Sequence, residues 1–198
     1  MKKFLCALMM AVLALGITAC GGAAEQSAPA PAAKTETAAP AADGGKKILV
    51  AYFSHTGNTE KVAQLIQSKT GADIFKIETA APYPSVYRET TELAKQEKAD
   101  NARPALKNKV ENMAQYDVVF VGYPIWWYTA PTIVNTFLES YDFSGKTMIP
   151  FATSGGSTID KSNADLKAAY PKLDWKPGRL LNSTSYSQLA DWKKQLGI

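Results

Sequence analysis

Short apolar runs alternate with helical patterns along residues 46–198, and this alternation restricts the possible folds more than any other feature. The run from Ile48 to Phe53 is almost continuously apolar, as expected for a strand buried on both faces of a sheet. Four consecutive apolar residues, Val118 to Val121, form the core of another such run. Strands separated by helices form parallel sheets with right-handed crossovers, so the sequence predicts an α/β fold.

Five strands and five helices are expected in this region, without an internal repeat or a second linker. The strands are expected at 48–53, 74–77, 117–122, 147–153 and 179–185, and the helices at 60–69, 86–99, 131–140, 159–169 and 187–196. Pro150 lies inside the fourth strand, although it has no N–H group to donate to a sheet. We expect a bulge or an unpaired acceptor there, and unbroken pairing through residue 150 would argue against this strand.

Residues 1–19 have the pattern of a bacterial signal peptide. Two lysines are followed by an apolar run from Phe4 to Ala19, which as a helix is about 24 Å long and too short for a membrane core of about 30 Å. The end of this run, Ile17 to Gly21, resembles the lipobox of bacterial lipoproteins. The resemblance implies cleavage before Cys20 and lipid attachment to Cys20. The alternative is an ordinary signal peptide with a chance cysteine.

Residues 20–45 are expected to form a disordered tether behind the lipidated cysteine. Between residues 21 and 45 there are ten Ala, four Gly and three Pro, and no aromatic residue, Val, Ile or Leu. Such a segment buries too little apolar surface to offset the entropy of ordering it. We therefore expect a domain at 46–198 that is held by lipid on the outer side of the cytoplasmic membrane, in the periplasm or at the cell surface.

Composition excludes several classes of function. One His and two Cys are too few for a structural zinc site or an iron–sulfur cluster. If Cys6 is removed with the leader and Cys20 is lipidated, no thiol is left for catalysis. The net charge of +4, without a block of basic residues, does not indicate nucleic-acid binding.

The loop after the first expected strand is a candidate anion site. Its residues are Ser54, His55, Thr56, Gly57, Asn58 and Thr59. Hydroxyl groups, a glycine and a helix amino terminus favour a phosphate monoester held without Lys or Arg. The loop matches neither the P-loop nor the dinucleotide motif, which disfavours nucleoside triphosphates and dinucleotides. The alternative is that the loop only caps a helix. For His55 two roles are open, a histidine exposed to solvent or a pH-sensitive contact to the phosphate.

Two further loops follow the third and fourth expected strands. The first contributes Pro124, Ile125, Trp126, Trp127 and Tyr128, and the second contributes Thr153, Ser154, Gly155 and Gly156. The aromatic loop offers a flat face for a planar ligand, or else a patch for a partner protein. The glycines let backbone N–H groups approach a polar edge. Ligands of parallel sheets bind at the carboxyl ends of the strands, and the three loops together predict flavin mononucleotide (FMN).

These motifs resemble the flavodoxin family along residues 46–198. Residues 54–59 are similar to its phosphate signature, and residues 122–127 and 153–156 are similar to the two isoalloxazine loops of a bacterial subfamily. The resemblance implies a three-layer sandwich of the short-chain form, with a five-stranded parallel sheet in the order 2-1-3-4-5. It also implies non-covalent FMN, with the redox chemistry on the flavin and no catalytic side chain. Trp126 or Trp127 would then cover one ring face, supported by Tyr128.

One departure from the family affects the expected partner. Flavodoxins are commonly acidic, whereas residues 46–198 carry 19 Lys and Arg against 15 Asp and Glu, so docking through an acidic surface is not expected. The preferred hypothesis is a membrane-tethered electron carrier that receives electrons from a separate reductase, its redox partner protein. The alternatives are an NAD(P)H-dependent FMN oxidoreductase acting on a quinone or another small acceptor, and a flavin-free binding module.

Overall fold

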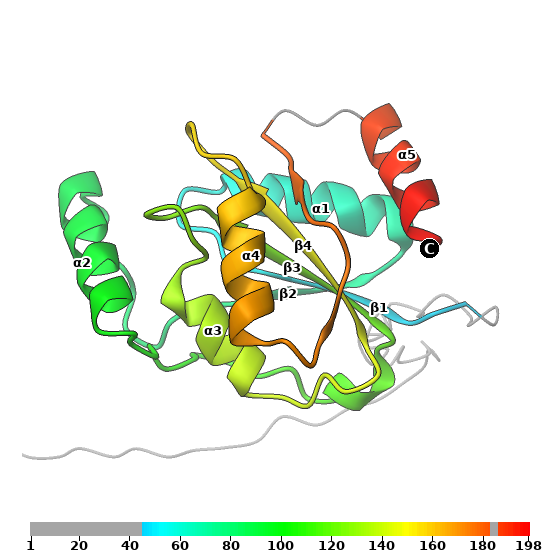
Figure 1. Ribbon diagram of the computed structural model, residues 1–198, viewed down its shortest axis with the longest axis horizontal. Coiled ribbons are helices and arrows are strands. Elements are labelled where there is room, and N and C mark those ends of the chain that lie inside the picture. The colour runs from blue at the N-terminus through cyan, green and yellow to red at the C-terminus, as the bar shows by residue number, and fades with distance from the viewer. Residues whose placement is uncertain (1–44, 183–185) are drawn as a thin grey trace, which may run out of the picture. The chain divides into compact units, whose positions relative to one another are not determined.

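A parallel β-sheet with helices on both faces forms the centre of the domain in the computed structural model, which describes residues 45–182 and 186–198 (Figure 1). Its strands are β1 (Ile48–Tyr52), β2 (Asp73–Lys76), β3 (Val118–Pro124), β4 (Thr147–Thr153), β5 (Asp174–Trp175) and β6 (Arg179–Leu180). The order is β2-β1-β3-β4-β5, with β6 also paired to β4, and every pairing is parallel. The predicted flavodoxin-like α/β fold and its 2-1-3-4-5 order are confirmed.

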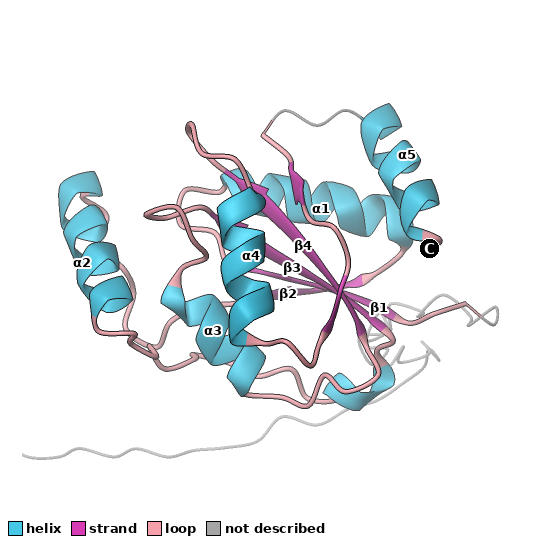
Figure 2. Ribbon diagram, viewed as in Figure 1, coloured by secondary structure: helices cyan, strands magenta, loops and turns pink. Residues whose placement is uncertain are grey.

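The helices cover the sheet in two layers, as Figure 2 shows. They are α1 (Asn58–Thr70), α2 (Tyr87–Ala99), α3 (Thr132–Glu139), α4 (Asp160–Ala169) and α5 (Tyr186–Leu196), with a short 3-10 turn at Met113–Gln115. Alternate residues of β1 enter opposite cores because successive side chains of a strand point to opposite faces. Leu49 and Ala51 pack on the side of α3 and α4, and Ile48 and Val50 on the side of α1 and α5.

Helix α2 differs from the others because it is mostly polar. Only Thr90 and Ala94 are buried along its length. Figure 1 shows it at one edge of the domain, beyond α3. The helix is therefore held against the domain by a few hydrogen bonds, among them those from Tyr83 and Thr132 to Glu97.

The last strand was expected at 179–185, and this expectation is wrong in extent. The structure has two short pieces instead, β5 and β6, and both pair with β4. Residues 183–185 lie outside the described residues, as do the expected signal peptide 1–19, the lipidation site Cys20 and nearly all of the tether 20–45. None of the helices that the structure describes is both long and apolar enough to cross a membrane.

Pro150 explains why the sheet edge is interrupted. Pairing of β3 with β4 runs unbroken through Val121 and Pro150, so the break expected from the sequence is absent on that side. The carbonyl groups of Met148 and Ala152 accept hydrogen bonds from the backbone N–H groups of Lys176 and Leu181, at 2.9 and 2.8 Å. Because bonding direction alternates along a strand, Pro150 also faces this side, in the interval between β5 and β6. The expected strand 147–153 is therefore correct, and unbroken pairing with β3 does not argue against it.

Candidate functional site

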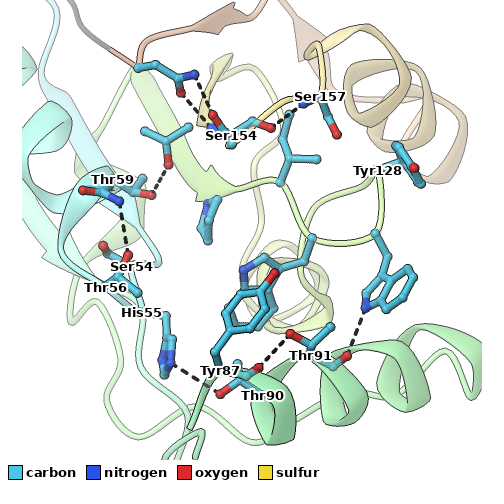
Figure 3. Close-up of a pocket in the computed structure, with 18 residues that line it drawn as sticks. Ser54, His55, Thr56, Thr59, Tyr87, Thr90, Thr91, Tyr128, Ser154 and Ser157 are labelled. Carbon is cyan, nitrogen blue, oxygen red and sulfur yellow. Dashed lines mark hydrogen bonds between the residues drawn. The ribbon is translucent and has the colours of Figure 1, made fainter. Parts of the chain in front are cut away.

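A cavity of about 720 Å³ lies at the carboxyl ends of β1, β3 and β4 (Figure 3), a volume typical of small-molecule sites. Of the predicted site residues, it is lined by Ser54, His55, Thr56, Asn58, Thr59, Pro124, Ile125, Trp126, Trp127, Tyr128, Thr153, Ser154 and Gly155. Gly57 and Gly156 are not among the lining residues. Five others that the sequence analysis missed also line it, namely Tyr87, Thr90, Thr91, Ser157 and Asn182. The three loops therefore meet in one pocket, together with α2 and the segment after β6.

The loop between β1 and α1 presents unpaired backbone N–H groups. Gly57 precedes α1 with φ 84°, a left-handed conformation that favours glycine. The Ser54 hydroxyl accepts a hydrogen bond from the N–H of Glu60 at 3.2 Å, which closes the loop on the helix. Within the described part of the chain, the N–H groups of residues 56–59 have no hydrogen-bond acceptor. They lie at the amino terminus of α1, where the helix dipole stabilises an anion.

A buried hydrogen bond joins the first loop to the third. The hydroxyl oxygens of Thr59 and Thr153 lie 2.9 Å apart, and both residues are buried. Either hydroxyl can be the donor, and the bond spans 94 residues of sequence. The Thr59 hydroxyl therefore holds the two loops next to each other, and Thr59 also lines the pocket.

The side chain of Asn182 stabilises the third loop through two hydrogen bonds to the backbone of Ser154. Its side-chain oxygen accepts a hydrogen bond from the Ser154 N–H at 2.7 Å, and its side-chain nitrogen donates to the Ser154 carbonyl at 2.6 Å. The Ser154 hydroxyl accepts in turn from the N–H groups of Gly156 and Ser157, at 3.1 and 2.7 Å. The N–H of Gly156, expected at the polar edge of a ligand, is thus used within the turn. Gly155 remains at the pocket.

Trp126 forms a fixed inner wall of the pocket. Its ring packs edge-to-face with Phe53, Tyr83 and His55, at centroid distances of 5.3, 5.1 and 5.9 Å. Burial, followed by the hydrogen bond to the Glu97 carboxylate, raises the pKa of Tyr83 far above its usual value. The Tyr83 hydroxyl therefore stays protonated and donates to Glu97 at 2.7 Å. This network holds the Trp126 ring in one orientation.

The His55 side chain is partly enclosed by neighbouring residues. Its ring is half-buried, with Nε2 3.5 Å from the Thr90 hydroxyl of α2. It also lies beside the rings of Tyr83 and Trp126. The His55 side chain therefore packs from the loop between β1 and α1 against α2 and two aromatic rings, rather than being free in solvent.

Trp127 and Tyr128 lie at the tip of a tight turn. The backbones of Trp126 and Thr129 exchange two hydrogen bonds of 3.0 and 3.1 Å, and Trp127 and Tyr128 between them have φ 49° and 68°. Positive φ at both central residues is typical of a type I′ turn, which usually contains Asn and Gly. Two bulky residues make this turn strained, and strain of this kind concentrates at functional sites. The Trp127 indole N–H donates to the carbonyl of Thr91 in α2, whereas the Tyr128 side chain is exposed.

The pocket carries no formal charge on its walls. Among the residues that line it in the described chain there is no Lys, Arg, Asp or Glu, and His55 is the only imidazole. Unpaired N–H groups at a helix start, one rigid aromatic wall and a neutral cavity fit the phosphate and the planar ring of FMN. Fold and site together define a mononucleotide-binding α/β protein with a site for a planar ring.

Comparison with known proteins identifies the family. The family model described as "Flavodoxin" matches residues 47–196. A crystal structure of a candidate flavoprotein from Bacteroides eggerthii is 46% identical, covering 78% of this chain and 99% of that one, with a TM-score of 0.74. A flavoprotein in complex with FMN from Lactobacillus acidophilus is 20% identical, covering 75% of this chain and 99% of that one, with a TM-score of 0.63, and shows the fold alone.

Curated relatives agree with this assignment over a shorter stretch. Flavodoxin 1 from Escherichia coli is 28% identical over 104 residues, which is 50% of this chain and 45% of that protein. The chain thus spans about half the length of the curated relatives that it matches. The chain belongs to the flavodoxin family. Membership of this family confirms the predicted cofactor, FMN.

Proposed function

We propose that this flavodoxin-like flavoprotein is an electron carrier anchored by lipid to the outer side of a bacterial membrane, and that it receives electrons from a separate reductase. The observation that carries the proposal is the uncharged pocket. Dinucleotide sites commonly use an acidic residue for the ribose of NAD or an arginine for the 2′-phosphate of NADP. Neither type of residue lines this pocket in the described chain, which favours a carrier over an enzyme that binds NAD(P)H itself.

Different residues of the pocket would hold different parts of FMN. When bound, FMN supplies one- and two-electron redox chemistry. The N–H groups of residues 56–59 would hold the phosphate, and the loop at Ser154 and Gly155 would supply polar groups to the edge of the ring. Trp126 would exclude water from one ring face. Because an apolar wall disfavours charge, Trp126 would also oppose additional negative charge on the ring and so make full reduction harder.

The first experiment measures flavin binding and turnover in one cuvette. The full chain, purified with mild detergent, is incubated with FMN and freed of excess, and its visible absorption spectrum is recorded. We expect a retained flavin band with a shifted shape, and no bleaching when NADPH is added without a reductase. Rapid bleaching by NADPH alone, followed by turnover with a quinone, would instead support the oxidoreductase. A colourless protein would leave only the flavin-free binding module.

Anchoring rests on the leader, Cys20 and the tether, so the redox partners are proposed to lie on the same side of the membrane. A flexible coil of 25 residues, the length of the proposed tether from residue 21 to residue 45, would span roughly 25–30 Å, enough to reach a neighbouring membrane protein.

The anchor can be tested by labelling cells with a radioactive fatty acid. The wild-type chain should carry label in the membrane fraction, and Cys20→Ser should carry none. Cys6→Ser, which changes the cysteine inside the leader, is the matched control and should keep the label. Equal labelling of the wild type and Cys20→Ser would contradict lipidation at this residue.

A further inference from the structure

The carboxamide of Asn182 bonds to both polar backbone groups of Ser154. Its oxygen accepts from the Ser154 N–H at 2.7 Å, and its nitrogen donates to the Ser154 carbonyl at 2.6 Å. Figure 3 draws these bonds as dashed lines beside Ser154. Asn182 follows β6 and is 28 residues away in sequence. The third loop is therefore held by a segment that does not belong to any of the three loops.

The bond to the Ser154 carbonyl also fixes the N–H of the next residue. The carbonyl of Ser154 and the N–H of Gly155 belong to one peptide unit, and every peptide bond in the described residues is trans. A trans peptide unit is planar, so its carbonyl and its N–H point in opposite directions. Asn182 thus sets the direction of the Gly155 N–H without touching it.

The Gly155 N–H is a hydrogen-bond donor that the loop itself does not use. Among residues 154–157, the Ser154 N–H donates to Asn182, and the N–H groups of Gly156 and Ser157 donate to the Ser154 hydroxyl. The N–H of Gly155 has no acceptor within the described part of the chain, and Gly155 lines the cavity. A donor in this position is available to an acceptor on a bound ligand.

We propose that Asn182 is a positioning residue of the flavin site, which holds the peptide between Ser154 and Gly155 so that the Gly155 N–H donates to the polar edge of the ring. This inference rests on the binding of FMN proposed above. An N–H donor binds an acceptor more strongly as the acceptor gains negative charge. The fixed Gly155 N–H therefore favours the reduced ring over the oxidised ring, in a pocket whose walls carry no formal charge.

The first test is a fluorescence titration of FMN and riboflavin against the full chain and its Asn182→Ala variant. The Kd of both oxidised flavins should rise about fivefold, the effect of losing one neutral hydrogen bond. The ratio of the two Kd values should stay the same, because the change does not touch the phosphate site. Asn108→Ala, which changes an exposed asparagine outside the cavity lining, is the matched control and should leave both values unchanged.

The midpoint potential of bound FMN separates positioning from general loosening of the loop. In Asn182→Ala the reduced flavin loses a charge-assisted bond, which is roughly twice as strong as a neutral one, so its Kd should rise about fivefold more than that of the oxidised flavin. The midpoint potential should therefore become more negative. A loop that is only loosened would weaken both redox states equally, and an unchanged potential would overturn the positioning role.

Asn182→Asp tests which of the two bonds matters. The carboxylate keeps an acceptor for the Ser154 N–H but has no donor for the Ser154 carbonyl. Riboflavin is used here because it lacks the phosphate that the new charge would repel. Asn182→Asp should lose as much riboflavin affinity as Asn182→Ala. Affinity equal to the wild type would show that the bond to the carbonyl is not required.

Amide hydrogen exchange followed by NMR tests the donor in the wild-type chain, so it does not depend on a variant that folds. Saturation with FMN should slow exchange of the Gly155 N–H several-fold. The Gly156 N–H, which is already bonded to the Ser154 hydroxyl, is the internal reference and should change much less. Exchange at Gly155 that FMN leaves unchanged would overturn the inference.

The outcomes distinguish this inference from the proposed function. If the wild type binds FMN and Asn182→Ala binds both flavins equally well, with the same potential, the positioning role is wrong and FMN binding stands. If Asn182→Ala weakens binding of FMN but not of riboflavin, Asn182 acts on the phosphate, and the inference is overturned. If the wild type does not retain FMN, both the inference and the proposed function are overturned.

Discussion

Gly122→Ala is expected to destabilise the folded domain by about 3 kcal/mol, near the upper end of the usual cost of overpacking a core. A Cβ atom on Gly122 would lie 2.1 Å from Cζ of Phe151 and within 2.6 Å of two further atoms of the same ring. Phe151 is fully buried, and its ring is rigid and enclosed by the core on the α1 and α5 side. Neighbouring groups must therefore shift, at the centre of the sheet. Thermal unfolding of the FMN-free protein should show a Tm lower by about 10 °C.

Gly155→Ala is the matched control for this prediction. The same Cβ atom at Gly155 would meet nothing within 4 Å, and Gly155 does not have a positive φ, so the Tm should hardly change. A second variant, Gly122→Ala with Phe151→Leu, removes the rigid ring and should recover part of the loss. If Gly122→Ala melts at the wild-type temperature, the close packing of β3 against the Phe151 ring is not a constraint on the fold.

Thr56→Asp is expected to weaken FMN binding about a hundredfold or more, while riboflavin, which has no phosphate, should be affected much less. Thr56 lies in the loop whose unpaired N–H groups at residues 56–59 form the proposed phosphate site. A carboxylate there competes for those donors and repels the phosphate, and two like charges about 4 Å apart near a protein surface cost about 4 kcal/mol. Titration of both flavins, followed by fluorescence, measures the difference.

Gln64→Glu provides the control for charge alone. It adds one negative charge on the exposed side of the same helix, α1, outside the pocket, and should change the Kd for FMN by less than about threefold. In the wild type, FMN should bind at least about a hundredfold more tightly than riboflavin, because charge-assisted hydrogen bonds are strong. Equal losses for FMN and riboflavin in Thr56→Asp would show that the phosphate does not lie at this loop.

The elements of the fold were predictable where the signal is local. The apolar run at Ile48–Phe53 and the four residues at 118–121 became the central strands β1 and β3. The end of the sheet was less predictable, because the missing N–H of Pro150 affects pairing with only one of the two strands beside β4. Whether it affects β3 or the β5 and β6 side depends on how the hydrogen bonds alternate along β4 in the folded sheet.

Of the five lining residues that the sequence analysis missed, Ser157 directly follows the third loop, and the other four come from outside the three loops. Tyr87, Thr90 and Thr91 lie on a polar helix that does not follow directly on a strand end of the pocket, so the rule about carboxyl ends does not find them. Asn182 is 28 residues from Ser154 and has no local feature that indicates its role. No signal in the sequence marks these four residues as neighbours of the pocket.

By itself, the sequence determined the alternation of strands and helices and the three loops that carry the binding chemistry. These depend on periodicity, on helix starts and on residue type, which act over a few neighbouring positions. Only the tertiary structure decided that Trp126 lines the inner wall while Trp127 turns to α2, although the two residues are adjacent. Their directions are set by a turn with two positive φ angles and by hydrogen bonds to a helix about 30 residues away, and such long-range contacts exist only once the chain has folded.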